Sequence, residues 1–125
     1  MARYVCVLAG GGVGSLARYL LGRAILQWFP GVQFSLGTFV INVTGSFLIG
    51  LLMTLIVERL ELSPYWHLTI VVGFLGGYTT FSSFEYDAYL SARSGNHGLA
   101  LGYLAASVVL GYGAVWLGVL VAGRR

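Results

Sequence analysis

Two long stretches of this chain contain no charged residue, and this limits its fold more than any other feature. They run from Phe34 to Val57 and from Gly98 to Gly123. A membrane-spanning helix needs about 20 mostly apolar residues, so each stretch is long enough to cross a bilayer. Only 9% of the 125 residues are charged, too few to cover a water-exposed surface. The sequence therefore predicts an all-α membrane protein.

Two further segments are predicted to cross the membrane. The third span covers residues 65–84, where Pro64 suits a helix start and two aromatic residues suit the membrane interface. The first covers about 3–28. Its second half contains Arg18 and Arg23, so we expect that half to approach the interface or a watery cavity. The prediction is a single transmembrane domain, residues 1–125, with four spans at about 3–28, 34–57, 65–84 and 98–123.

The distribution of arginines gives almost no orientation signal. With four antiparallel spans, four arginines lie on one side (positions 3, 59, 124 and 125) and three on the other (positions 18, 23 and 93). Cytoplasmic loops normally carry a clear excess of positive charge. Either another factor fixes the topology, or the chain inserts in both orientations. We interpret Glu85 and Asp87, between the last two spans, as charges at a helix end.

The composition excludes several functions. The net charge of +3 comes from arginines scattered between apolar runs, and there is no basic stripe with interleaved aromatics, so no nucleic-acid partner is predicted. No nucleophile, base and acid form a catalytic set, so we do not expect an enzyme. The middle of each span lacks Asp and Glu, the residues that usually relay protons or bind cations in transporters.

Glycines recur at a spacing typical of packed membrane helices. Gly10 and Gly14 form one pair with small residues four positions apart, and Gly73 and Gly77 form another. Such pairs let two backbones approach closely. The glycine-rich run at 10–14 superficially resembles a phosphate-binding loop, but it lies inside an apolar span instead of after a strand. Helix packing is the favoured interpretation.

Polar side chains follow one face of the second span and one face of the fourth. Thr38, Asn42 and Ser46 lie four residues apart, so they share a face of a helix. Tyr103 and Ser107 have the same spacing. A carboxamide in hydrocarbon needs a partner, so Asn42 must face another helix or water. These groups either join helices or line a pore.

The third span contains a segment that makes a poor helix interior. Gly76 and Gly77 are soon followed by two threonines and two serines, whose hydroxyls compete for backbone hydrogen bonds. A break in the helix is predicted there, and the carbonyl oxygens that it frees are able to coordinate a cation. The neighbouring donors are an amide, hydroxyls and the positive edges of aromatic rings, which suit a small anion.

Three segments resemble the Fluc family of fluoride channels, also called CrcB. They are GGVGSLARY at 11–19, GTFVINVTGSF at 37–47 and GFLGGYTTFSSFE at 73–85. The resemblance covers essentially the whole chain. It implies a fluoride-selective channel that releases fluoride passively and confers fluoride resistance, in the plasma membrane of a prokaryote. It also implies a homodimer of antiparallel, dual-topology subunits with two pores at their interface, which accounts for the even distribution of arginines.

The resemblance also implies roles for particular residues. The pore would be lined by an amide, two phenylalanine edges and a track of hydroxyls, namely Asn42, Phe81, Phe84, Ser82, Ser83, Tyr103 and Ser107. Arg18 would lie at the vestibule and attract anions. The backbone carbonyls of Gly76 and Thr79 in both subunits would hold a structural Na⁺ at the dimer centre. The family often has another hydroxyl one turn beyond Ser107, where this chain has Gly111.

Two other functions compete with a fluoride channel. A small dual-topology multidrug-type antiporter also has four helices, but it would need a membrane-embedded glutamate in the first span, where this chain has Arg18. A non-conducting assembly subunit would use its polar stripes only to join helices. Fluoride flux through liposomes that contain this protein alone separates the three.

Overall fold

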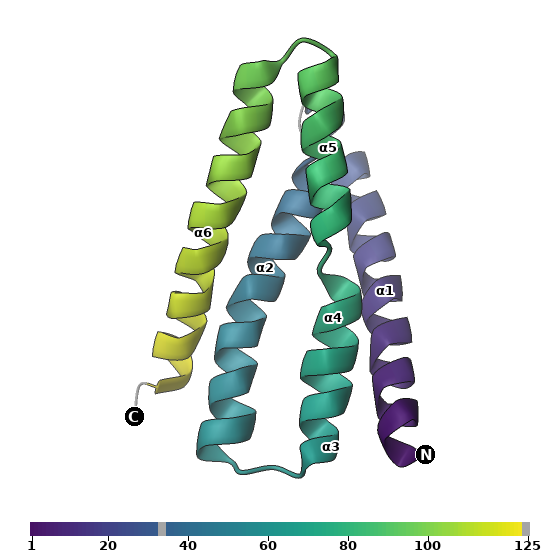
Figure 1. Ribbon diagram of the computed structural model, residues 1–125, viewed down its shortest axis with the longest axis vertical. Coiled ribbons are helices and arrows are strands. Elements are labelled where there is room, and N and C mark those ends of the chain that lie inside the picture. The colour runs from purple at the N-terminus through teal and green to yellow at the C-terminus, as the bar shows by residue number, and fades with distance from the viewer. Residues whose placement is uncertain (33–34, 124–125) are drawn as a thin grey trace.

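The computed structural model describes residues 1–32 and 35–123, and every regular element in these two ranges is a helix (Figure 1). Two of the segments, η1 and η2, are π-helical. The order is α1 (Ala2–Trp28), α2 (Leu36–Met53), η1 (Thr54–Arg59), α3 (Pro64–Trp66), η2 (His67–Leu75), α4 (Gly76–Tyr78), α5 (Phe81–Arg93) and α6 (His97–Gly123). The long arms alternate in direction, so that α1 begins and α6 ends at the same end of the molecule (Figure 1).

Three helices in the described ranges are long and apolar enough to cross a membrane. They are α1, the continuous α2–η1 helix over Leu36–Arg59, and α6. The all-helical prediction is confirmed, and these helices fit a multi-pass membrane protein. Phe34, the predicted start of the second span, lies outside the described residues, as do Arg124 and Arg125.

The third apolar region consists of two helical arms separated by a break. α3, η2 and α4 form one arm, which begins at Pro64 after the N-cap residue Ser63. Thr79 and Thr80 then adopt extended backbone, with ψ of 157° and 122°, and α5 begins at Phe81. Figure 1 shows this interruption between α4 and α5. The break therefore lies in the predicted region, directly after the glycine pair.

The second arm is longer than the sequence indicated. We placed the end of the third span at residue 84, but α5 continues to Arg93, and only a short turn at 94–96 connects it to α6. Gly95 makes this turn with φ of +90°, a conformation that favours glycine. Charged residues end an apolar run, but they do not end a helix. Glu85 and Asp87 lie well inside α5, so our interpretation of them as helix-end charges is wrong.

The predicted glycine pairs bring α1 against the first arm. A Cβ on Gly10 would overlap the backbone carbonyl of Thr69, and one on Gly14 would overlap that of Phe74. A Cβ on Gly77 would lie 2.5 Å from a carbonyl oxygen of α1. Because no side chain fits at these positions, the two backbones touch directly, and the predicted packing role of these glycines is confirmed.

A second backbone contact, which the sequence analysis missed, joins α2 to α6. A Cβ on Gly50 would overlap the carbonyl of Val115, and a Cβ on Gly118 would overlap that of Phe47. The two glycines lie on different helices, so no spacing within one segment marks them as a pair. α2 packs mainly on α6, and α1 packs mainly on η2 and α4. The break in the third region directly follows α4, so it lies at the end of the arm that packs on α1.

Candidate functional site: a groove beside the helix break

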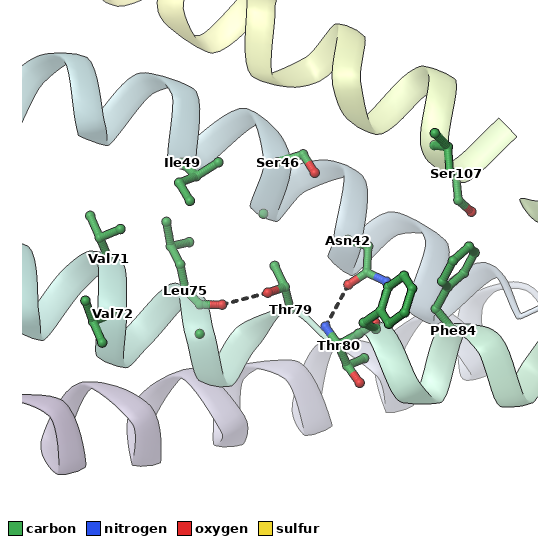
Figure 2. A pocket seen from close by; sticks show the side chains of 14 residues that line it. Asn42, Ser46, Ile49, Val71, Val72, Leu75, Thr79, Thr80, Phe84 and Ser107 are labelled. Carbon is green, nitrogen blue, oxygen red and sulfur yellow. Dashed lines mark hydrogen bonds between the residues drawn. The ribbon is translucent and has the colours of Figure 1, made fainter. Parts of the chain in front are cut away.

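An open groove of about 500 Å³ lies beside the break, bordered by α2, η2, α4, α5 and α6 (Figure 2). Its lining comes from segments that are far apart in the sequence, and no charged residue is among the described residues that line it. Six of the predicted site residues line this groove: Asn42, Gly76, Thr79, Phe81, Phe84 and Ser107. The structure thus brings together an amide, two aromatic rings, a hydroxyl and the two residues of the predicted cation site.

The carboxamide of Asn42 is bonded to the backbone at the break. Its Nδ2 donates to the Thr80 carbonyl at 2.9 Å. The Thr80 N–H donates to its Oδ1, also at 2.9 Å, and Figure 2 draws this second bond. The extended conformation of Thr80 takes these two backbone groups out of the helical pattern, so they need other partners. Asn42 supplies both. One amide N–H of Asn42 remains for a ligand, because a carboxamide carries two.

The two predicted phenylalanines differ in their surroundings. Phe84 is buried, and its ring meets the ring of Tyr103 at a centroid distance of 5.2 Å and an angle of 60°, an edge contact. Phe81 is 70% exposed, and its ring lies 5.9 Å from that of Phe84. Phe84 is therefore fixed by packing within the subunit, whereas Phe81 stands at the open side of the groove.

The predicted hydroxyl track is only partly assembled in one subunit. Ser107 lines the groove, and its Oγ is buried with no hydrogen-bond partner among the described residues. Ser83 lines a second cavity, and Ser82 is exposed outside the lining of both cavities. Tyr103 is buried against Phe84 and lines neither. Of the four predicted hydroxyls, Ser107 alone faces the groove.

Arg18 contacts the other side of the break. Its Nε donates to the Gly77 carbonyl at 3.1 Å, which places a cation at the C-terminal end of the first arm, where the helix dipole favours it. Arg18 lines a cavity of about 340 Å³ together with Arg23 and Thr80. Thr80 also lines the groove, so this residue of the break borders both cavities. The guanidinium keeps four further N–H donors.

The break frees one carbonyl oxygen of the first arm. In a continuous helix the Gly76 carbonyl would accept the N–H of Thr80, but that N–H donates to Asn42. No hydrogen bond to the Gly76 carbonyl from a residue of the described ranges replaces it. Thr79 instead donates both its N–H and its hydroxyl to Leu75, at 3.0 and 2.9 Å. Backbone oxygens of this kind are suitable cation ligands.

The sequence analysis missed a polar chain that ends at Asp87. The Ser35 hydroxyl donates to Thr38 at 3.1 Å, and the Thr38 hydroxyl donates to Asp87 Oδ2 at 2.9 Å. Asp87 is half-buried in the second turn of α5, so the carboxylate faces α2 instead of bulk water. Thr38 lies one turn before Asn42 on the same helix face, which indicated that its hydroxyl has a partner but not that Asp87 is this partner.

Comparisons with known proteins find relatives along nearly the whole chain. The model of the family described as "CrcB-like protein, Camphor Resistance (CrcB)" matches residues 5–119. A protein of Solibacter usitatus named Fluoride-specific ion channel FluC is 56% identical over 122 residues, which cover 98% of this chain and 99% of that protein. Proteins with the same name from Acidobacterium capsulatum and Gloeothece citriformis are 48% and 40% identical, over 98% and 99% of this chain and 97% and 99% of their own lengths.

The match runs from α1 to α6 and so includes the break, the groove and both helix pairs. Every described residue that lines the groove lies within the residues matched by the family model. This chain therefore belongs to the CrcB-like family.

Proposed function

We propose that the protein is a fluoride channel that lets fluoride leave the cell passively. The observation that carries this proposal is the groove, where neutral hydrogen-bond donors and aromatic rings converge beside a helix break with no charged residue in the described lining. Relatives of nearly the same length are named fluoride-specific ion channels. A small anion accepts strong hydrogen bonds, and the lining supplies neutral donors for them. Because the described lining contains no charged residue, it does not hold the ion too tightly for conduction.

Three features favour an anion over a cation along this path. The N-terminal end of α5 points its first N–H groups at the break, where the helix dipole is positive. Asn42 keeps one amide N–H beside it. Arg18 lies in the neighbouring cavity and attracts anions toward the break. An antiporter that exchanges cations for protons is not supported, because the described lining of the groove lacks a carboxylate.

A passive pathway is sufficient for protection. Hydrogen fluoride is a weak acid that enters cells as a neutral molecule, ionises inside and is trapped as the anion. A channel that conducts the anion alone lets it return down its own gradient, so no coupling ion is required. Deletion of the gene, in a strain that has no other fluoride exporter, should therefore slow growth in acidic medium that contains fluoride.

The complete pore is proposed to form between two subunits that run antiparallel. In one subunit the groove is open, and Phe81 is 70% exposed at its edge. Gly76 is exposed too, and a Cβ placed on it would meet nothing within 4 Å in this chain. A second copy covers both features, and insertion in both orientations explains the nearly even arginine count of four against three.

We further propose that the carbonyls of Gly76 and Thr79 from both subunits hold a structural Na⁺. The Gly76 oxygen has lost its helical donor, and the exposed position of this residue allows two subunits to approach there. A fixed positive charge at the dimer centre would stabilise the two broken helices and favour anions near them. Exchange of all Na⁺ for a large organic cation should lower fluoride flux, and labelled Na⁺ should not cross the membrane with fluoride.

The decisive experiment is fluoride efflux from liposomes that contain only the purified protein. A fluoride-selective electrode records release after the membrane potential is short-circuited, and a parallel measurement with a chloride electrode gives the selectivity. We expect rapid fluoride release and far slower chloride release. Fluoride release no faster than that of empty liposomes would overturn the proposal and would leave the role of an assembly subunit.

A further inference from the structure

Serine and threonine hydroxyls of the described helices differ in where they donate their hydrogen bonds. In one group the hydroxyl donates to the carbonyl four residues earlier in its own helix, as apolar surroundings favour. Its members are Thr44, Thr54, Thr69, Thr79 and Ser91. In a second group the hydroxyl donates no hydrogen bond to a described residue, and its members are Ser15, Ser46, Ser82, Ser83 and Ser107. Of these, Ser46 and Ser107 line the groove.

Ser46 lies directly opposite a gap in the row of hydroxyls on α6. Tyr103, Ser107 and Gly111 follow one another at intervals of four residues, so they share a face of α6, each about 6 Å from the next along the axis. Gly111 is buried, and a Cβ placed there would meet only the Ser46 Oγ, at 3.4 Å. The hydroxyl of α2 thus reaches the position where a side chain at 111 would stand.

We propose that Ser46 is a pore residue that continues the hydroxyl row of α6 beyond Ser107. The missing side chain of Gly111 leaves room for the Ser46 hydroxyl, which donates a hydrogen bond to an anion moving along the groove past Asn42. The Ser46 hydroxyl does not donate to its own helix as the five residues of the first group do, so it is available to an anion in the groove. This inference rests on the proposed fluoride channel and adds one contact to its path.

The experiment moves the hydroxyl from one helix to the other. Fluoride efflux is measured for Ser46→Ala, for Ser46→Ala with Gly111→Ser, and for Ser46→Ala with Gly111→Ala. Ser46→Ala removes the hydroxyl donor. Adding Gly111→Ser restores a hydroxyl from α6, whereas adding Gly111→Ala restores only side-chain volume. Thr69→Ala is the matched control, because its hydroxyl serves its own helix and lies outside the groove lining. Only variants that elute from a sizing column like the wild type are compared.

We expect Ser46→Ala to lower fluoride flux by about tenfold, the effect of one hydrogen bond to a charged partner. In the Ser46→Ala background, Gly111→Ser should restore most of the fluoride flux and Gly111→Ala should not. If Ser46→Ala does not fold, Ser46→Cys keeps the volume with a much weaker donor and should also lower the flux. Wild-type flux from Ser46→Ala, or equal rescue by both changes at 111, would overturn this role. Absence of flux from the wild type would instead overturn the proposed function.

Discussion

Asn42 and Thr80 exchange two hydrogen bonds of 2.9 Å, although they lie 38 residues apart in the chain. The Asn42 side chain pairs the Thr80 N–H and C=O, which in a continuous helix would bond to the preceding and the following turn. The third region is thereby able to open in apolar surroundings without an unpaired N–H or C=O at Thr80. The same two bonds orient the remaining amide N–H of Asn42. The structural role of Asn42 and its proposed conducting role therefore belong to one side chain.

Substitution of Asn42 should separate these two roles. Asn42→Asp keeps an acceptor for the Thr80 N–H, loses the donor to its carbonyl and, when ionised, repels anions. Fluoride flux should be abolished. Asn42→Ala leaves both backbone groups unpaired and should lower the free energy of unfolding by about 1–3 kcal/mol. Flux and thermal unfolding in detergent are measured on the same samples. A folded Asn42→Asp variant with undiminished flux would show that the amide is not part of the pore.

Replacement of either phenylalanine should lower fluoride flux, but only the change at Phe84 should also lower the free energy of unfolding. Phe81→Ile and Phe84→Ile each keep an apolar side chain but remove the ring edge, so both should reduce fluoride flux. Phe84 also loses its edge contact with Tyr103, so this variant alone should be less stable, by about 0.5–1.5 kcal/mol. Phe47→Ile, outside the groove lining, is the control. The assignment fails if both variants conduct as well as this control.

Alanine at the glycines should divide them into two classes. Gly14→Ala and Gly118→Ala place a Cβ against a carbonyl of the facing helix, so the helices must separate and the yield of folded protein should fall sharply. Gly12→Ala and Gly102→Ala introduce a Cβ into open space, and they should be neutral or gain up to about 1 kcal/mol from helix propensity. Sizing-column profiles and melting temperatures test this. Equal losses in both classes would contradict the packing interpretation.

The contact between Thr38 and Asp87 should be measurable as a coupling. Thr38→Val removes a hydrogen bond to a half-buried carboxylate and should cost about 1.5–3 kcal/mol of unfolding free energy. In an Asp87→Asn background the same change should cost less, because the remaining group is neutral. A double-mutant cycle on melting data gives the difference. If the losses of unfolding free energy from Thr38→Val and Asp87→Asn simply add, the two side chains are not energetically coupled.

The sequence alone determined the features that depend on neighbouring residues. The second and fourth spans follow from the length of charge-free runs, and the helix break follows from two glycines near four hydroxyl side chains. Both are properties of a short segment. The close packing of Gly10 and Gly14 follows from a spacing of four on one helix. Membership of an anion-conducting family could be proposed because its motifs are contiguous stretches of the chain.

Which groups come into contact depends on how the helices pack in three dimensions. The pair of Gly50 and Gly118, the partner of Asp87 and the partner of Asn42 all depend on how each helix is rotated and shifted against another. A sequence fixes which residues share a helix face, but in apolar surroundings most faces are similarly hydrophobic, so the pattern does not set that rotation. Direct backbone contact at glycines and a few buried hydrogen bonds set it, and both join residues that are distant in the chain.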